Sequence, residues 1–195
     1  MRKANVTRKT KETGISAQLV IEGKGNAAVR SKIGFFSHML ESFAKHGLFD
    51  LALNITGDLH VDQHHVVEDT GITLGQAFDK ALGQRKGIQR AGCFMCPMDE
   101  SLVLVALDIS GRPFVRFDGK LRKDKVGDLD VSLLEDFFLG FASALQATIH
   151  VKIMYGRSDH HKVEAVFKAF GKALCDACRI APQAKGRTPS TKGVI

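Results

Sequence analysis

The 195-residue sequence has no tryptophan, one tyrosine, four prolines and four cysteines. With so few of the aromatic side chains that stack on bases, it shows no aromatic and basic surface for nucleic acid. No apolar run approaches the roughly 18 residues that a membrane-spanning helix needs. The basic N-terminus lacks the apolar segment of a secretory signal. We therefore expect a cytoplasmic protein with no nucleic-acid and no membrane partner.

The four cysteines form two Cys-x-x-Cys pairs, Cys93 with Cys96 and Cys175 with Cys178. Two such pairs are typical of a structural zinc site. However, the pairs are far apart in the sequence, and the second ends a helical pattern, where this spacing only marks one face of a helix. Buried free thiols in a reducing compartment are the preferred interpretation.

The net charge of +7 indicates an anionic partner. Nucleic acid is one candidate, but the basic residues are scattered along the chain. A small phosphorylated molecule explains the same charge and is the partner that we expect.

The most informative feature is a motif, His-His-x-x-Glu, that occurs twice. Residues 62–69 read DQHHVVED and residues 158–165 read SDHHKVEA. Each copy leads into an apolar-periodic segment, which predicts that it begins an amphipathic helix. A single copy is usually no more than polar residues near a helix start, but recurrence at half the chain length favours metal binding.

Helix geometry assigns roles within each copy, because residues four apart lie on the same face. His64 with Glu68, and His160 with Glu164, can each hold one ion. The neighbouring histidines, His65 and His161, point toward another site. The repeat therefore predicts two metal sites of mixed imidazole and carboxylate ligands.

The remaining elements repeat in the same order. In the first half, strands are expected at 2–11, 15–22, 27–33 and 49–56, with helices at 35–47, ended by Gly47, and at 64–83. In the second half, strands are expected at 90–98, 101–109, 113–118 and 148–155, with helices at 132–146 and 160–178. Each half is thus β-β-β-α-β-α, a two-layer α+β unit within the α/β class. The helices are expected to pack either against the other half or against another subunit.

This duplication divides the chain into a first repeat at 1–89, a second at 90–183, and a polar C-terminal tail at 184–195, which Gly and Pro interrupt and which is interpreted as a mobile or ligand-ordered segment. It also suggests further ligands. His38 lies on the first helix of repeat one, and Asp136 occupies the corresponding place in repeat two. Each would complete one site, although Asp136 alone would look like a solvated helix residue.

Together, and in this order, the segments RKTKET, FFSHML, GDLHVDQHHVVEDTGITLGQA, PMDE, LDISGRP, SDHHKVEAVFKAFGKAL and PSTKGV resemble the imidazoleglycerol-phosphate dehydratases of histidine biosynthesis. The resemblance covers nearly the whole chain. It implies a duplicated ribosomal protein S5 domain 2-like fold, trimers assembled into a 24-subunit shell, and two Mn²⁺ per active site. The reaction would be dehydration of imidazole glycerol phosphate to imidazole acetol phosphate.

The resemblance also implies roles for individual residues, with ligands from more than one subunit. One ion would be held by His64, Glu68, Asp136 and His161, and the other by His38, His65, His160 and Glu164. Proton transfer would fall to Glu12, with Glu164 as the alternative. Substrate contacts would come from Glu12, His46, Arg90, Arg112, Lys168, Ser190 and Lys192. The last five of these would bind the phosphate group, which makes 184–195 a phosphate-binding tail, and His46 and Asp99 would line the pocket.

The chain departs from the family pattern at two positions. Ser37 stands where an aspartate is usual, and Asp136 where many members have histidine; His150 is the alternative ligand if Asp136 does not bind. Two other functions stay open at this point. A two-metal phosphohydrolase would use similar residues, and a metal-storing shell would use the sites without chemistry.

Overall fold

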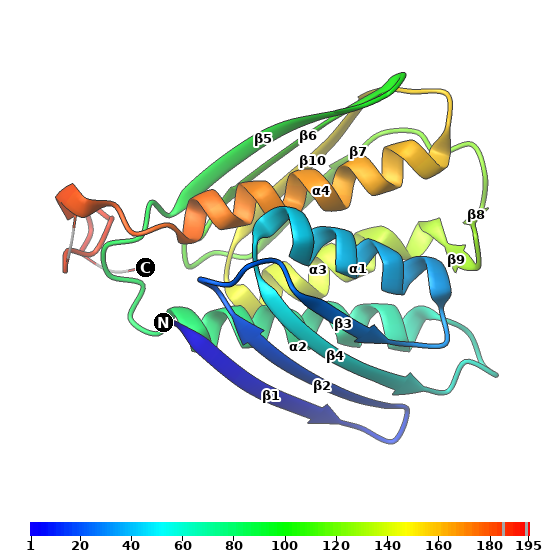
Figure 1. The fold of residues 1–195 in the computed structure, drawn as a ribbon, viewed down its shortest axis with the longest axis horizontal. Helices are drawn as coiled ribbons and strands as arrows, with labels where there is room; N and C mark the ends of the chain where they lie inside the picture. The colour runs from blue at the N-terminus through cyan, green and yellow to red at the C-terminus, as the bar shows by residue number, and fades with distance from the viewer. Residues whose placement is uncertain (185, 194) are drawn as a thin grey trace.

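The computed structural model describes residues 1–184, 186–193 and 195, which fold into two similar halves (Figure 1). The first half consists of β1 (Lys3–Lys9), β2 (Thr13–Val20), β3 (Ala27–Arg30), α1 (Gly34–Gly47), β4 (Asp50–Gly57) and α2 (His64–Leu82). The second consists of β5 (Ala91–Met98), β6 (Ser101–Asp108), β7 (Phe114–Asp118), β8 (Lys125–Val126), β9 (Leu129–Asp130), η1 (Val131–Leu133), α3 (Leu134–Leu145), β10 (Thr148–Tyr155) and α4 (Asp159–Cys178), followed by η2 (Pro182–Ala184). The predicted order of elements and the duplicated α+β fold are confirmed.

The two four-stranded sheets have the same topology, β1-β2-β4-β3 in one half and β5-β6-β10-β7 in the other. In each, the short third strand pairs in parallel with the last strand, and the other pairings are antiparallel. Even the register repeats, since Ile15 opposes Ile55 and the equivalent Val103 opposes Ile153. Equivalent residues of the two halves therefore occupy equivalent places.

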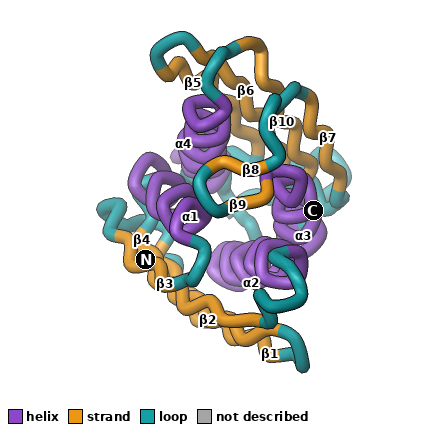
Figure 2. Tube along the Cα trace, turned by 90° about the vertical axis from the view of Figure 1, so that its right-hand side faces the viewer, coloured by secondary structure: helices purple, strands orange, loops and turns teal. Residues whose placement is uncertain are grey.

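The helices lie between the two sheets, so the molecule has four layers (Figure 2). Helix α1 packs against α4, and α2 packs against α3, so both helix pairs cross the boundary between the halves. Of the two arrangements expected from the sequence, the halves bury their helices against each other. Nine phenylalanines are completely buried in this region: Phe36, Phe43, Phe49, Phe78, Phe137, Phe138, Phe141, Phe167 and Phe170.

Glycines allow the helices to approach closely at these crossings. A Cβ atom on Gly75 of α2 would lie 2.6 Å from the carbonyl oxygen of Phe141. A Cβ atom on Gly171 of α4 would lie 2.3 Å from the carbonyl oxygen of Phe43. The two contacts are the same contact in the two halves, because Gly75 and Gly171 occupy equivalent positions, as do Phe141 and Phe43.

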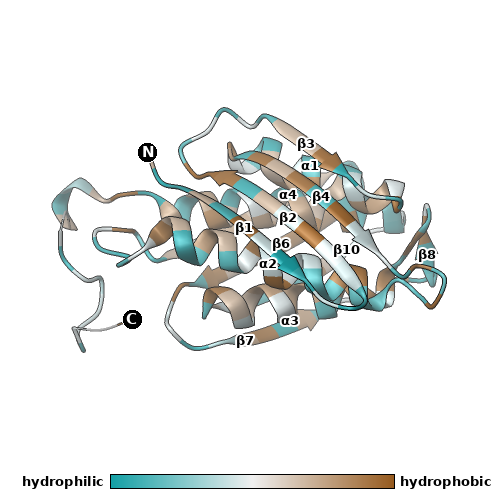
Figure 3. Ribbon diagram, turned by 90° about the horizontal axis from the view of Figure 1, so that it is seen from below, coloured by the Kyte–Doolittle hydropathy of each residue, from teal (hydrophilic) through white to brown (hydrophobic). Residues whose placement is uncertain are grey.

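Buried and more exposed residues alternate along most of β2 and β4 in the first sheet, whose ribbon is coloured by hydropathy in Figure 3. The hydrophobic residues face the helices, as the period of two in a strand requires. No helix among the described residues is long and apolar enough to span a membrane.

Two details differ from the sequence-based expectations. Gly47 is the last residue of α1, as predicted, but the left-handed conformation that usually explains a glycine at a helix end falls on Leu48 (φ 57°). A Cβ on Gly47 would lie 2.8 Å from the carbonyl oxygen of Gly171, so close packing explains this glycine. The hairpin of β8 and β9 was not predicted, because its strands are only two residues long. Its signal is the Gly127–Asp128 turn, with Gly127 at φ 59°.

Candidate metal centre

The two His-His-x-x-Glu motifs lie in the first turns of α2 and α4, as predicted. Each turn is fixed by a side chain just before it. Asp62 accepts a hydrogen bond from the backbone N–H of His64 (2.8 Å), and Ser158 accepts one from the N–H of His161 (3.3 Å). These contacts satisfy N–H groups that a helix start leaves unpaired, and they set the direction of the histidines.

A first cluster joins α2 to α3. The Nε2 atom of His64 lies 3.7 Å from Oε2 of Glu68, and its Nδ1 atom lies 3.4 Å from Oδ2 of Asp136. All three side chains are partly exposed. The structure therefore brings together three of the four residues assigned to one ion, from both halves of the chain.

A second, equivalent cluster joins α4 to α1. Oε2 of Glu164 lies 3.3 Å from Nε2 of His160 and 3.8 Å from Nε2 of His38. Lys168 completes this cluster, with Nζ 2.8 Å from Oε1 of Glu164. Burial alone would raise the pKa of the Glu164 carboxyl, but its bond to the Lys168 ammonium lowers the pKa below its ordinary value. Glu164 is thus an anion that can bind a cation.

The second histidine of each motif points away from both clusters and toward a carboxylate. Nδ1 of His65 lies 3.1 Å from Oδ2 of Asp58, and this hydrogen bond raises the pKa of His65. Nδ1 of His161 lies 2.8 Å from Oε2 of Glu100. Within one chain, His65 and His161 are therefore not brought to the ions that the sequence assigned to them.

Glu12 and Glu100 occupy equivalent positions, each directly before the second strand of its half. Glu12 is half exposed (53%), with Oε2 3.9 Å from Nδ1 of His65. Glu100 is held by hydrogen bonds from His161 and from backbone N–H groups, of which that of Ser158 is the shorter. These bonds, led by that from His161, lower the pKa of Glu100 to about 2.

In the described part of the chain, one group of three ligand-type residues has all its ligand atoms within 4.8 Å of one another: Asp99, Glu100 and His161. Its geometry is that of a support rather than an ion site, because both Glu100 oxygens already accept hydrogen bonds. Asp99 is mostly exposed, with Oδ2 3.8 Å from Nε2 of His161.

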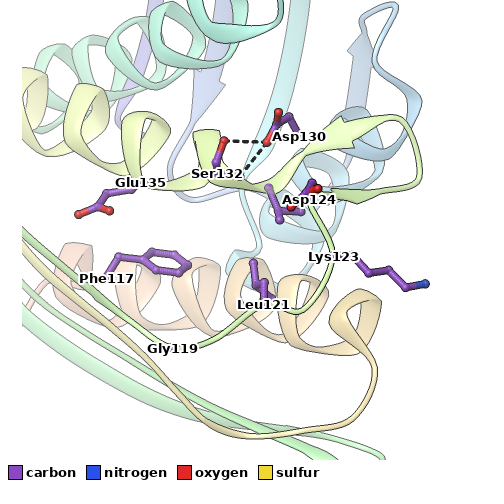
Figure 4. Close-up of a pocket in the computed structure, with 9 residues that line it drawn as sticks. Phe117, Gly119, Leu121, Lys123, Asp124, Asp130, Ser132 and Glu135 are labelled. Atoms are coloured by element: carbon purple, nitrogen blue, oxygen red, sulfur yellow. Dashed lines mark hydrogen bonds between the residues drawn. The ribbon is translucent and has the colours of Figure 1, made fainter.

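A cavity of about 460 Å³ opens beside the second cluster and is lined in part by four predicted site residues, His38, His46, Glu164 and Lys168. Burial and then the nearby positive charges lower the pKa of His46, so its ring is kept neutral. Another cavity, of about 430 Å³, lies between β7 and the start of α3 (Figure 4). Glu135, Phe117 and Leu121 are among its lining residues, and it includes none of the predicted site residues.

The residues predicted to bind phosphate lie largely at the other end of the molecule. Arg90 forms a two-pronged ion pair with Asp108 (2.6 and 2.9 Å) and donates to the carbonyl of Pro189 in the tail. The backbone N–H of Arg90 donates to the carbonyl of Ala177, near the C-terminal end of α4. The metal ligands of α4 lie at the N-terminal end of the helix. A helix of 20 residues is roughly 30 Å long, at 1.5 Å per residue.

The other predicted phosphate ligands divide between the two ends. Arg112 follows β6, in the turn that the C-terminal residue Ile195 approaches beside Gly111. Ser190 and Lys192 belong to the tail, where the Ser190 hydroxyl accepts from the N–H of Lys192 (3.2 Å). Lys168 alone lies with the metal ligands.

The two departures from the family pattern are also placed. The Ser37 hydroxyl donates to the carbonyl of Ile33 within its own helix (3.2 Å). His150 packs against Phe114 with 5.7 Å between ring centroids, and it lies exposed on the second sheet. Asp136, not His150, therefore stands beside His64 in this chain.

Sequence reasoning missed the carboxylates behind the second histidines, Asp58 and Glu100. Asp58 lies too far from His65 in sequence for helix spacing to connect them. Glu100 had a usable signal, the similarity of its context to that of Glu12 in the other repeat.

Comparisons with known proteins point to one family. The family model for imidazoleglycerol-phosphate dehydratase matches residues 31–174. The chain is 52% identical to the imidazoleglycerol-phosphate dehydratase of Koribacter versatilis and 53% identical to that of a Thermoanaerobacter species, over the full length of all three chains.

Solved structures of this enzyme are also similar. That from Pyrococcus furiosus is 38% identical with a TM-score of 0.84, covering 97% of this chain and 100% of the other. That from Staphylococcus aureus is 34% identical with a TM-score of 0.82, covering 92% and 99%.

Proposed function

Because this chain belongs to the imidazoleglycerol-phosphate dehydratase family of hydro-lyases in histidine biosynthesis, we propose that it converts imidazole glycerol phosphate to imidazole acetol phosphate with two Mn²⁺ per active site. The observation that carries the metal part of the proposal is the equivalence of the two clusters. A histidine and a glutamate one turn apart meet a third ligand from the other half, at 3.3–3.8 Å, in both places.

The side chains present fit this metal. Imidazole and carboxylate together suit Mn²⁺, and a six-coordinate ion leaves positions for substrate, whereas Zn²⁺ prefers four ligands. His64, Glu68 and Asp136 would hold one ion, and His38, His160 and Glu164 the other. When bound, the ions would act as Lewis acids that orient the imidazole ring of the substrate and make it an electron acceptor.

Proton transfer is assigned to Glu12. The reaction must remove a weakly acidic C–H proton beside the ring and then release the neighbouring hydroxyl as water, so a positioned acid–base group is required. The Glu12 carboxylate is half exposed and lies next to His65. Substrate can therefore reach the Glu12 carboxylate, which lies beside His65, a predicted metal ligand.

The proposed site is completed by self-association. Each cluster contains three of its four expected ligands, and His65 and His161 face elsewhere, so other copies of the chain would supply them. The phosphate of the substrate would meet Arg90, Arg112, Ser190 and Lys192 from a chain other than the one that supplies Lys168. Exposed apolar side chains on the second half, among them Met95, Phe114, Met154 and Tyr155, favour such association. The proposed assembly is a trimer-based shell of 24 subunits.

The proposed location is the cytoplasm. All four cysteines are free, but they are not all buried as the sequence predicted: Cys96 and Cys178 are buried, Cys175 is partly buried, and Cys93 is exposed. Burial raises the pKa of the Cys178 thiol to about 12, which keeps it protonated and unreactive.

The proposal is tested by turnover of imidazole glycerol phosphate. Metal-stripped protein should be inactive, and activity, measured through the ketone of the product, should return as Mn²⁺ reaches two ions per subunit. No inorganic phosphate should be released, in contrast to a phosphohydrolase. Metal uptake without turnover would refute the proposed reaction, and turnover without metal would refute the metal role.

A further inference from the structure

The duplication has placed a glutamate at the same point in both halves, but the two carboxylates are held differently. Glu12 and Glu100 each precede the second strand, and each approaches Nδ1 of the second histidine in its motif. The distances are 3.9 Å from Glu12 to His65 and 2.8 Å from Glu100 to His161. Only the second distance is that of a hydrogen bond.

In the first half, another residue has taken the hydrogen bond of the histidine. Asp58 lies 3.1 Å from Nδ1 of His65, and its own backbone N–H donates to the carbonyl of Glu12 (3.1 Å). The Glu12 side chain is left half exposed (53%). Asp58 thus holds the histidine and frees Glu12 for another task.

In the second half, no carboxylate stands at the equivalent position. Gly57 and Gly156 occupy the same place, because a Cβ atom on either would meet the first residue of the second strand, Thr13 or Ser101. The residue after each is Asp58 in the first half and Arg157 in the second, so the second half offers a cation there. Glu100 itself fills the role, with Oε2 on Nδ1 of His161 and Oε1 accepting from the N–H groups of Ser158 (2.6 Å) and Arg157 (3.1 Å).

We infer that Glu100 is a positioning residue: it holds the proton of His161 on Nδ1 and so leaves Nε2 unprotonated to bind an ion. This inference rests on the proposed function, since it concerns how a metal ligand is prepared. A carboxylate on the remote imidazole nitrogen fixes the tautomer and orientation of a metal-binding histidine. Glu12 and Glu100 therefore have the same origin in the fold and different tasks.

Two variants separate this role from a purely structural one. In Glu100→Gln, the carbonyl oxygen can still accept from Ser158 and Arg157, but the amide NH₂ faces Nδ1 of His161 and favours the proton on Nε2. In Glu100→Ala, the backbone contacts are lost, but the imidazole is free to choose its tautomer. A tautomer role predicts that Gln impairs metal binding more than Ala does, whereas a structural clamp predicts the reverse.

The measurement is Mn²⁺ titration of the metal-stripped protein, followed by electron paramagnetic resonance of free Mn²⁺, with thermal unfolding of each variant recorded alongside. We expect Glu100→Gln to weaken the affinity for one of the two ions about 10–100-fold, the usual effect of losing a residue that supports a metal ligand. Glu100→Ala should weaken it less and lower the unfolding temperature more. Glu22→Gln, which changes a remote carboxylate paired with Arg2, should behave as wild type.

Two results would overturn the inference. The first is that Glu100→Gln binds two ions with wild-type affinity, or binds them more tightly than Glu100→Ala does. Glu100 would then not set the tautomer, and the proposed function would be unaffected. If the wild-type protein itself binds no Mn²⁺, both the inference and the proposed metal centre fail. The wild-type titration therefore distinguishes the two failures.

Discussion

His160 and Glu164 lie one turn apart on α4, with Nε2 of the histidine 3.3 Å from Oε2 of the glutamate. If they hold an ion together, His160→Asn should reduce bound Mn²⁺ from two ions per subunit to one and abolish turnover, because an amide is a much weaker metal ligand than imidazole. The matched control is His150→Asn, which changes a histidine exposed on the second sheet. Metal analysis after gel filtration would check both, and equal metal loss in the two variants would contradict the assignment.

Glu12→Gln is expected to remove the proton-transfer group without disturbing the metal ligands. Turnover should fall about 10²–10⁴-fold, the usual contribution of general acid–base catalysis. Two bound Mn²⁺ and the wild-type unfolding temperature should be retained, because the Glu12 side chain lies 3.9 Å from the nearest ligand atom. Steady-state kinetics with metal analysis test this, and full activity of the variant would assign the proton to another residue.

Asp136→His is expected to change which metal the first cluster prefers. The aspartate adds a second carboxylate beside His64 and Glu68, and hard oxygen ligands favour Mn²⁺. Replacing it with imidazole should raise the affinity for Zn²⁺ relative to Mn²⁺, as measured by competition between the two ions. Asp136→Asn keeps the shape of the side chain without its charge, so it should weaken the binding of both Zn²⁺ and Mn²⁺ at this cluster. An unchanged Zn²⁺ to Mn²⁺ ratio in Asp136→His would mean that Asp136 acts only on Nδ1 of His64.

Features that recur in both halves of the chain were predictable from the sequence. The His-His-x-x-Glu spacing fixed His64 near Glu68 and His160 near Glu164, since helix geometry alone relates residues four apart. The pairing of His38 with Glu164, and of Asp136 with His64, also agrees with the duplication. These contacts depend only on which helices cross.

Features that depend on tertiary distance were not predictable. Nothing local connects Asp58 to His65, or Glu100 to the N–H of Ser158. Gly47 ends α1 as predicted, but the left-handed residue there is Leu48, and close contact with α4, not a left-handed backbone, accounts for the glycine. The separation of Arg90 from the metal ligands likewise follows from the direction of α4, which no spacing in the sequence reveals.

Asp128, in the turn of the β8–β9 hairpin, caps α1 across the boundary between the halves. Its oxygens accept from the backbone N–H groups of Gly34 (2.6 Å) and Phe35 (2.8 Å). Asp128→Ala should destabilise the protein by about 1 kcal/mol, as loss of a helix cap usually does. Thermal unfolding of metal-stripped protein measures this, with the exposed Asp118→Ala on β7 as the control.

The same cap should depend on pH. Burial alone would raise the pKa of Asp128, but the two backbone N–H groups lower it below the ordinary 3.8. Because the folded protein binds this proton less readily than the unfolded chain, the cap stabilises fully above about pH 3.8 and is lost as the pH falls below it. The stability difference between wild type and Asp128→Ala should therefore shrink below that pH, and a constant difference would contradict the role of the charge.

Gly171→Ala tests the close helix crossing that brings the second cluster together. The new Cβ would lie 2.3 Å from the carbonyl oxygen of Phe43, a backbone atom that cannot move alone, so α1 and α4 must separate. Overpacking of this kind costs about 1–3 kcal/mol, seen as a lower midpoint of denaturant unfolding. Gly34→Ala is the matched control: its Cβ would meet only Oδ2 of Asp128, at 3.5 Å.

Because His38 and Glu164 lie on the separated helices, Gly171→Ala should also weaken Mn²⁺ binding at that cluster, whereas Gly34→Ala should not. Unchanged stability and metal affinity in Gly171→Ala would show that the crossing tolerates a side chain and that the glycine has another cause.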